Sequence, residues 1–228
     1  MMPESQPLIA LISATPAAIA PAEAAFARVF PAAVLWNILD DRLLIEATYR
    51  GGLDPELQIR MGRLIDHAAA GGADGVLLTC SMYAPVARES VTAGVTVLAP
   101  DEAAFERIGN LAPQRLLVVA SLPDALQDSC DRLRAELGRR RIPTEVSGVL
   151  AAEAFAAASA GDTERLFEAV RGALGAGGET DPAPVFLAQY SLAPAAPVIA
   201  ERLGRTVITG PDSAAEWLRD RLRLRNRA

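Results

Sequence analysis

The chain has 228 residues, of which 51% are hydrophobic, and its 28 acidic and 22 basic side chains leave a net charge of −6. The sequence holds no lysine, so every basic side chain is an arginine. This composition is typical of a soluble globular protein with one or two domains. The absence of lysine excludes enzymes that form a Schiff base through that amine, and an acidic chain with 5% aromatic residues is a poor nucleic-acid binder.

Short apolar runs alternate with amphipathic stretches along the chain. The runs typical of buried strands are, in chain order, Leu8–Ala14, Ala33–Ile38, Gly75–Thr79, Thr96–Leu98, Arg115–Ala120, Pro143–Val149, Val185–Ala188 and Thr206–Thr209. The stretches with helical spacing are Pro21–Val29, Pro55–Ala70, Asp101–Ile108, Asp124–Arg140, Thr163–Leu174, Val198–Leu203 and Ser213–Arg225, and a loop is expected over Gly175–Pro184. This alternation predicts an α/β fold whose parallel sheets are covered on both faces.

The two cysteines, Cys80 and Cys130, and the one histidine, His67, exclude further classes of site. Two distant thiols form neither a disulfide framework nor a metal knuckle, and one histidine cannot build a multi-histidine metal site. The first residues carry no basic side chain before their apolar stretch, and no apolar run reaches the ~18 residues that cross a bilayer. We therefore expect a cytoplasmic protein that binds no metal and no membrane.

The second half of the chain repeats the first. Residues LLTCSMYAP (77–85) align without a gap on FLAQYSLAP (186–194), and LIALISATP (8–16) aligns on RLLVVASLP (115–123). A third pair, TVLAPDEAA (96–104) and TVITGPDSAA (206–215), follows in the same order with one extra residue. Three ordered matches predict an internal duplication. We expect two pseudo-symmetric Rossmann-like halves, each a short parallel sheet flanked by helices: residues 1–98, completed by 210–228, and residues 99–209.

The duplication also predicts where a ligand binds. Ligands of open α/β sheets lie beyond the carboxyl ends of the strands, so we expect an active site in the cleft between the halves. Cys80 and Gln189 occupy equivalent strand ends and are expected to face each other there. The helical segments that follow direct backbone N–H groups into the site, which binds carboxylates and lowers the pKa of a thiol. The neighbouring candidates for substrate binding are Ser13, Thr15, Thr79, Ser81, Ser121, Ser191 and the phenol of Tyr190.

These features resemble the aspartate/glutamate/hydantoin racemase superfamily. The resemblance rests on the two halves, on TCSMYAP after a strand in the first and LAQYSLAP in the second, and on NILDDRLLIEA (37–47). It implies an enzyme that works without a cofactor and moves a proton on the carbon next to the carboxylate of a small acid. The typical racemase of this superfamily uses one cysteine in each half. The first maps onto Cys80, and the second maps onto Gln189, where this sequence departs from the pattern.

The departure changes the expected chemistry. A glutamine amide does not titrate in water, so Gln189 orients a substrate but cannot relay its proton. With Cys80 as the single catalytic thiol, the resemblance implies one-sided chemistry, as in the arylmalonate decarboxylase or maleate isomerase branches. Two alternatives stay open: a true amino-acid or hydantoin racemase that uses Tyr190 as its second group, and a non-catalytic module that binds a small carboxylate. The substrate and any homo-oligomer are not defined by the sequence.

Other polar residues are expected to be structural. We expect Cys130 to pack inside the protein, and His67 to lie on the polar side of its helix. Asp40 and Asp41 are adjacent acids at a strand end, and we expect solvation rather than binding of a cation. Structural roles compete with these functional ones. Cys80 suits a packed core, and Gln189 suits capping a helix or hydrogen-bonding the backbone. The hydroxyls that also suit a helix N-cap are those of Ser81, Ser191, Ser121 and Thr15.

Overall fold

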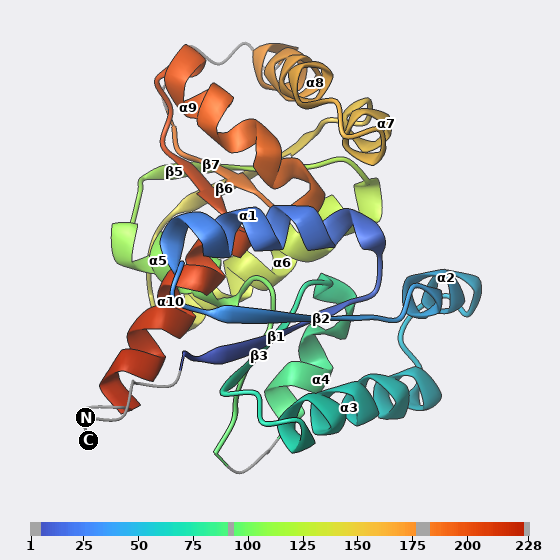
Figure 1. The fold of residues 1–228 in the computed structure, drawn as a ribbon. Helices are drawn as coiled ribbons and strands as arrows, with labels where there is room; N and C mark the ends of the chain where they lie inside the picture. Colours follow the sequence, from blue (N-terminus) through green and yellow to red (C-terminus); the bar gives the residue numbers. More distant parts are fainter. Residues whose placement is uncertain (1–5, 91–93, 177–182, 226–228) are drawn as a thin grey trace. The chain divides into compact units, whose positions relative to one another are not determined.

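The structure is a computed structural model that describes residues 6–90, 94–176 and 183–225. It divides into two compact units: unit 1 comprises Met1–Ala103 and Ala214–Ala228, and unit 2 comprises Ala104–Ser213. Each unit contains one four-stranded sheet in which all pairs are parallel (Figure 1). The α/β class and the duplication predicted from the sequence are confirmed, because the strand order is β2-β1-β3-β4 in unit 1 and β6-β5-β7-β8 in unit 2.

The elements of unit 1 are β1 (Leu8–Ser13), η1 (Pro16–Ala18), α1 (Ile19–Val29), β2 (Val34–Leu39), α2 (Arg42–Tyr49), α3 (Pro55–Ala70), β3 (Gly75–Leu78), η2 (Ser81–Tyr83), α4 (Ala84–Glu89) and β4 (Thr96–Leu98). Here η denotes a 3₁₀ turn. Helix α5 (Glu102–Leu111) leads into unit 2, which contains β5 (Arg115–Ala120), α6 (Pro123–Arg139), β6 (Glu145–Leu150), α7 (Ala154–Ser159), α8 (Thr163–Ala176), β7 (Val185–Leu187), η3 (Tyr190–Ala195), α9 (Ala196–Leu203) and β8 (Val207–Thr209). Helix α10 (Gly210–Arg225) returns to unit 1.

All eight predicted strands are present, and each of their ends lies within two residues of its predicted position. Three helices, α2, α4 and α7, have no counterpart among the predicted helical stretches, although a helical segment was expected after Cys80. They have eight, six and six residues, and such short helices complete too few turns to show a clear helical period. Residues 177–182, which belong to the expected loop Gly175–Pro184, lie outside the described residues, as do residues 226–228.

Both faces of the unit 1 sheet are covered, which explains why its central strands are apolar throughout. On one face, Ile12 of β1 and Leu78 of β3 pack with Met61 and Ile65 of α3 and with residues of α2 and α4. On the other face, Leu218 of α10 lies so close to β3 that a Cβ added to Gly75 would meet its side chain at 3.2 Å. A fully buried Leu or Ile contributes roughly 1.5–3 kcal/mol, so β1 and β3 hold the unit together.

Unit 2 repeats this arrangement. Helices α7, α8 and α9 cover one face of its sheet, where Val119 of β5 packs with Phe167 and Val170 of α8. Helices α5 and α6 cover the other, where Phe105 and Phe186 meet edge to face with ring centroids 5.9 Å apart. In the described part of the chain, no helix combines the length and the apolar character that a bilayer crossing requires.

Candidate functional site

Cys80 and Gln189 occupy matching positions in the two units. Each follows the carboxyl end of the third strand of its unit and immediately precedes a 3₁₀ turn, η2 after Cys80 and η3 after Gln189. Both residues are extended, with φ/ψ of −118°/119° at Cys80 and −131°/140° at Gln189. The chain therefore presents a thiol at this strand end in one unit and an amide at the same strand end in the other.

The Cys80 thiol is half-buried, and it lies among backbone donors and one acid. The backbone N–H groups of Met82 and Tyr83 act on its sulfur as hydrogen-bond donors, as the sequence led us to expect at the start of a helical segment. The carboxylate of Asp101 also acts on it electrostatically. Asp101 is buried, with 2% of its surface exposed, in the segment between β4 and α5.

The expectation that this thiol has a lowered pKa is wrong. Burial raises the pKa of Cys80 to about 11, and the charge of Asp101 acts in the same direction. The donors at Met82 and Tyr83 lower it, but they do not outweigh the loss of solvation. Helix α4 has only six residues, so its dipole is small. At neutral pH the side chain is therefore predominantly a thiol.

Of the four other candidates in unit 1, two have protein partners, and two have none among the residues that the structure describes. Ser13 and Thr79 are buried at the ends of the neighbouring strands β1 and β3, and the Thr79 hydroxyl donates to Ser13 Oγ at 2.9 Å. Thr15 and Ser81 are half-buried, and within the described residues neither hydroxyl bonds to another protein group. Thr15 and Ser81 are thus the better placed of the four to bind a ligand.

In unit 2, Gln189 is oriented by Ser121, which follows β5 in the chain. The backbone N–H and the hydroxyl of Ser121 both donate to Gln189 Oε1, at 2.6 Å and 2.9 Å. A backbone N–H can only donate, so the oxygen of the amide must face Ser121 and Nε2 must point elsewhere. Ser121 and Tyr190 are buried and Ser191 is half-buried. The arrangement holds an amide donor, Nε2, at the strand end.

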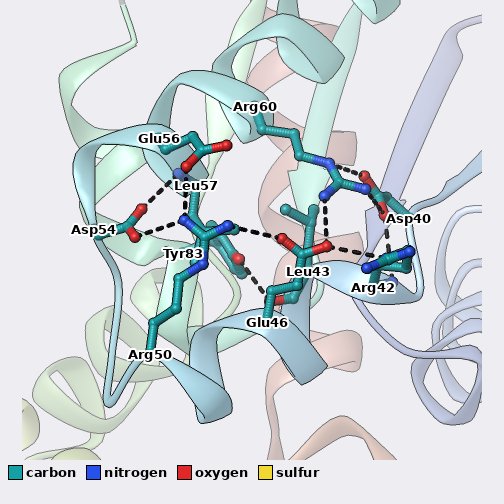
Figure 2. A network of polar contacts seen from close by, with 10 residues as sticks. All are labelled: Asp40, Arg42, Leu43, Glu46, Arg50, Asp54, Glu56, Leu57, Arg60 and Tyr83. Carbon is teal, nitrogen blue, oxygen red and sulfur yellow. Dashed lines mark hydrogen bonds and ion pairs between the residues drawn. The ribbon is translucent and has the colours of Figure 1, made fainter.

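A network of charged residues links helix α2 to α3 and to the segments that flank α2 (Figure 2). Arg60 of α3 binds Asp40 through two contacts of 2.7 Å and also reaches Glu46 at 3.1 Å. Arg50, at the end of α2, contacts Glu46, Asp54 and Glu56 at 3.1, 2.8 and 2.8 Å. We expected Asp40 to be a solvated acid, but it forms an ion pair with Arg60.

Tyr83 connects this network to the thiol. Its side chain is fully buried, and its hydroxyl donates to the carbonyl oxygen of Leu43 in the first turn of α2 at 2.9 Å (Figure 2). Burial raises the pKa of Tyr83 to about 12, and the neighbouring Cys80 and Asp40 act in the same direction. Tyr83 thus donates one hydrogen bond from its backbone N–H to the Cys80 sulfur and another from its hydroxyl to α2.

Sequence reasoning missed Asp101 and Tyr83 as neighbours of the thiol. The only sequence signal for Asp101 was the repeated Pro-Asp pair, Pro100-Asp101 and Pro211-Asp212. The structural roles expected for the remaining thiol and the histidine are confirmed, because Cys130 is buried in unit 2 and His67 is exposed. Within the described ranges, no three His, Cys, Asp or Glu side chains converge in a way that could hold a metal ion.

No protein-family model matches the chain, and no curated protein sequence does. Solved structures do match it. The aspartate racemase of Picrophilus torridus has a TM-score of 0.69 at 16% identity, over 93% of this chain and 92% of that one. The allantoin racemase of Klebsiella pneumoniae gives 0.69 at 18%, over 96% and 88%. An arylmalonate decarboxylase gives 0.55 at 22%, over 95% and 92%. These likenesses, all under 25% identical, establish the fold alone: the chain has the fold that these two racemases and this decarboxylase share.

Proposed function

We propose that this protein is an enzyme that delivers a proton to the carbon next to the carboxylate of a small acid, and that the Cys80 thiol is the proton donor. The observation that carries the proposal is that equivalent strand ends of the two units carry a thiol, Cys80, whose pKa is raised by burial, and an amide, Gln189. An acid is present at one position and a group that cannot titrate at the other, which favours one-sided proton transfer over two-base racemisation.

The reaction that fits this donor best is decarboxylation of a substituted malonate. The bond between the α-carbon and one carboxylate breaks, carbon dioxide leaves, and the electron pair spreads over the remaining carboxylate as an enediolate. The S–H bond of Cys80 then breaks, its proton bonds to the α-carbon, and a thiolate is left. The thiolate takes a proton from solvent before the next turnover. A reducing compartment such as the cytoplasm keeps a free thiol of this kind reduced, and we propose that location for the enzyme.

Hydroxyl and amide groups are proposed to bind the substrate carboxylates. In unit 1 these are Thr15 and Ser81, whose hydroxyls have no protein partner within the described residues. In unit 2 they are Ser121 and Gln189, whose Nε2 is directed away from Ser121. Several oriented dipoles can bind a carboxylate without a cationic side chain, which suits a chain that lacks lysine.

The proposal is tested by incubating the protein in D₂O with substituted malonates, amino acids and hydantoins. Carbon dioxide release and deuterium at the α-carbon are measured by mass spectrometry. We expect a malonate to lose carbon dioxide and gain one deuterium, and Cys80→Ala to lose at least about 10³-fold in rate. Cys130→Ala is the matched control, because it removes the other thiol, which packs in the core of unit 2. Saturable binding without turnover across the panel would instead indicate a carboxylate-binding module.

Racemisation is the second candidate, because the aspartate and allantoin enzymes that share this fold are racemases by name. In that case Tyr190, next to Gln189, is the proposed second group. A single enantiomer would then lose optical activity in the presence of the protein, and Tyr190→Phe would abolish that loss. Retention of optical activity together with malonate decarboxylation excludes this candidate.

A further inference from the structure

Asp101 places a buried carboxyl group beside the proposed proton donor. Strands β3 and β4 pair in parallel with Leu77 opposite Leu98. Cys80 comes three residues after Leu77, and Asp101 comes three residues after Leu98. Both therefore lie beyond the carboxyl ends of adjacent strands, at the same edge of the unit 1 sheet. Cys80 is still extended, and only 2% of the surface of Asp101 is exposed. A charge in such a place is poorly screened by water.

We propose that Asp101 is a positioning residue that disfavours a negative charge on the Cys80 sulfur. Burial already favours the S–H form, and the negative charge of Asp101 adds to this effect by disfavouring a second negative charge on the neighbouring sulfur. After proton transfer to the substrate carbon, the thiolate stands beside a carboxylate, which favours its prompt reprotonation by solvent. The role in the reaction rests on the proposed function, whereas the effect on the sulfur does not.

Other ionisable groups near the sulfur do not replace Asp101 in this role. The phenol of Tyr83 is neutral at physiological pH and bonds to Leu43. Asp40, Glu46 and Arg60 act on Tyr83, and their charges are paired with one another. Glu102, next to Asp101, forms an ion pair of 2.7 Å with Arg88. Among the described residues, Asp101 is the charged side chain that acts on the Cys80 sulfur.

A purely structural role for Asp101 has to be separated from this one, because the residue immediately precedes α5 and aspartate is a common N-cap. Asparagine and serine cap helices about as well as aspartate but carry no charge.

Unit 2 offers a matched control in Asp212 of the repeated Pro-Asp pair. Asp212 is in the first turn of α10 and accepts a hydrogen bond from the Thr209 hydroxyl at 2.8 Å. Asp212→Asn removes the same charge in the unit that lacks Cys80.

The test measures the rate at which iodoacetamide alkylates Cys80 in the full-length protein at about pH 8. Trypsin cuts this lysine-free chain at arginine, so Cys80 is read in the peptide Leu64–Arg88 and Cys130 in Leu116–Arg132. Asp101→Asn and Asp101→Ser are compared with wild type, with Asp101→Glu, which keeps the charge, and with Asp212→Asn. Thermal denaturation identifies the variants that are folded at the temperature of the assay.

We expect Asp101→Asn and Asp101→Ser to alkylate faster at Cys80, by about threefold for each unit by which the thiol pKa falls, because tenfold more thiolate is offset in part by its lower nucleophilicity. Asp101→Glu and Asp212→Asn are expected to keep the wild-type rate. An unchanged rate in folded Asp101→Asn or Asp101→Ser overturns the proposal, as does equal acceleration in Asp101→Glu. If either neutral variant does not fold, the other decides, and the wild-type rate in Asp101→Glu is required in both cases. Faster alkylation without turnover of any malonate leaves the effect on the sulfur standing and contradicts the proposed function alone.

Discussion

One side-chain oxygen of Gln189 accepts two hydrogen bonds from Ser121, from its backbone N–H at 2.6 Å and from its hydroxyl at 2.9 Å. The amide is therefore held in one orientation, with its donor nitrogen turned away from Ser121. A glutamate at this position accepts the same two bonds but has no donor to offer. The substitution Gln189→Glu therefore removes the Nε2 donor and keeps the two hydrogen bonds from Ser121 that position the side chain.

Gln189→Glu is expected to raise KM for a carboxylate substrate about tenfold or more and to change kcat much less. The substitution deletes the Nε2 donor and adds a negative charge that repels the substrate carboxylate. Steady-state kinetics with the substrate found in the D₂O panel measures the effect. Gln127→Glu, which adds the same charge on an exposed face of α6, is the control and should leave KM unchanged. An unaltered KM in Gln189→Glu would show that the amide does not touch the substrate.

The pH dependence of the rate separates a thiol that acts as an acid from one that acts as a base. With the pKa of Cys80 at about 11, the S–H form is almost fully populated throughout the neutral range. If the thiol donates a proton, kcat/KM should show no thiol-dependent rise between about pH 6.5 and 9. A rate that climbs about tenfold per pH unit over this range would identify the thiolate as the reactive form and contradict the assignment.

The raised pKa of Cys80 also predicts a loss of stability in alkali. Below the ordinary thiol pKa of 9.0, the folded and unfolded states are both protonated, and the full stability is present. As the pH rises towards 11, the unfolded thiol ionises while the folded one does not, so unfolding becomes more favourable. By about pH 10.5 the loss from this group is on the order of 2 kcal/mol.

Urea denaturation of wild type and Cys80→Ala at about pH 8 and pH 10.5 measures this contribution. Tyr83, whose pKa is raised to about 12, and Cys130 weaken both proteins in alkali, so the difference between the two isolates Cys80. The free energy of unfolding of the alanine variant should fall less, by on the order of 2 kcal/mol. Equal falls in both proteins would mean that the folded state does not disfavour the thiolate.

Tyr83→Phe is expected to destabilise the protein by about 0.5–1.5 kcal/mol, the usual worth of one hydrogen bond, because it removes the donor to the Leu43 carbonyl. Chemical denaturation measures the change, and hydrogen exchange of the α2 amides should speed up with it. Tyr49→Phe deletes a hydroxyl from a side chain that is 89% exposed and should leave both measurements unchanged. Slow α2 exchange in Tyr83→Phe would mean that the charged network alone fastens this helix.

The strands could be read from the sequence because the central ones are buried on both faces. Arg115–Ala120 is apolar after its first residue and is bounded by polar and Pro-containing segments, so its limits coincide with those of β5. The duplication then located the strand ends that carry Cys80 and Gln189. Helix α7, by contrast, has six residues, four of them alanine, and a segment of this kind has no contrast between an apolar and a polar face.

The environment of each side chain was the part that sequence could not supply. A hydroxyl after a strand looks the same whether it is half-buried without a protein partner, as in Ser81, or buried against another hydroxyl, as in Thr79. The direction of the Cys80 pKa was misjudged for the same reason, because burial and the charge of Asp101 arise from residues distant in sequence. Local sequence patterns predict the course of the backbone well. The solvation of each side chain depends on neighbours that only the folded chain brings together.

The division of the chain into units has a practical consequence for spectroscopy. The two tryptophans, Trp36 in β2 and Trp217 in α10, both belong to unit 1. The ring of Trp36 meets the ring of His67 edge-on, with the ring centroids 5.3 Å apart. Intrinsic fluorescence excited at the indole band therefore reports on unit 1 alone, whereas far-ultraviolet circular dichroism averages over every helix of the chain. Melting curves that coincide by the two methods would reveal a single cooperative transition, and separate midpoints would reveal that the halves lose their structure one after the other.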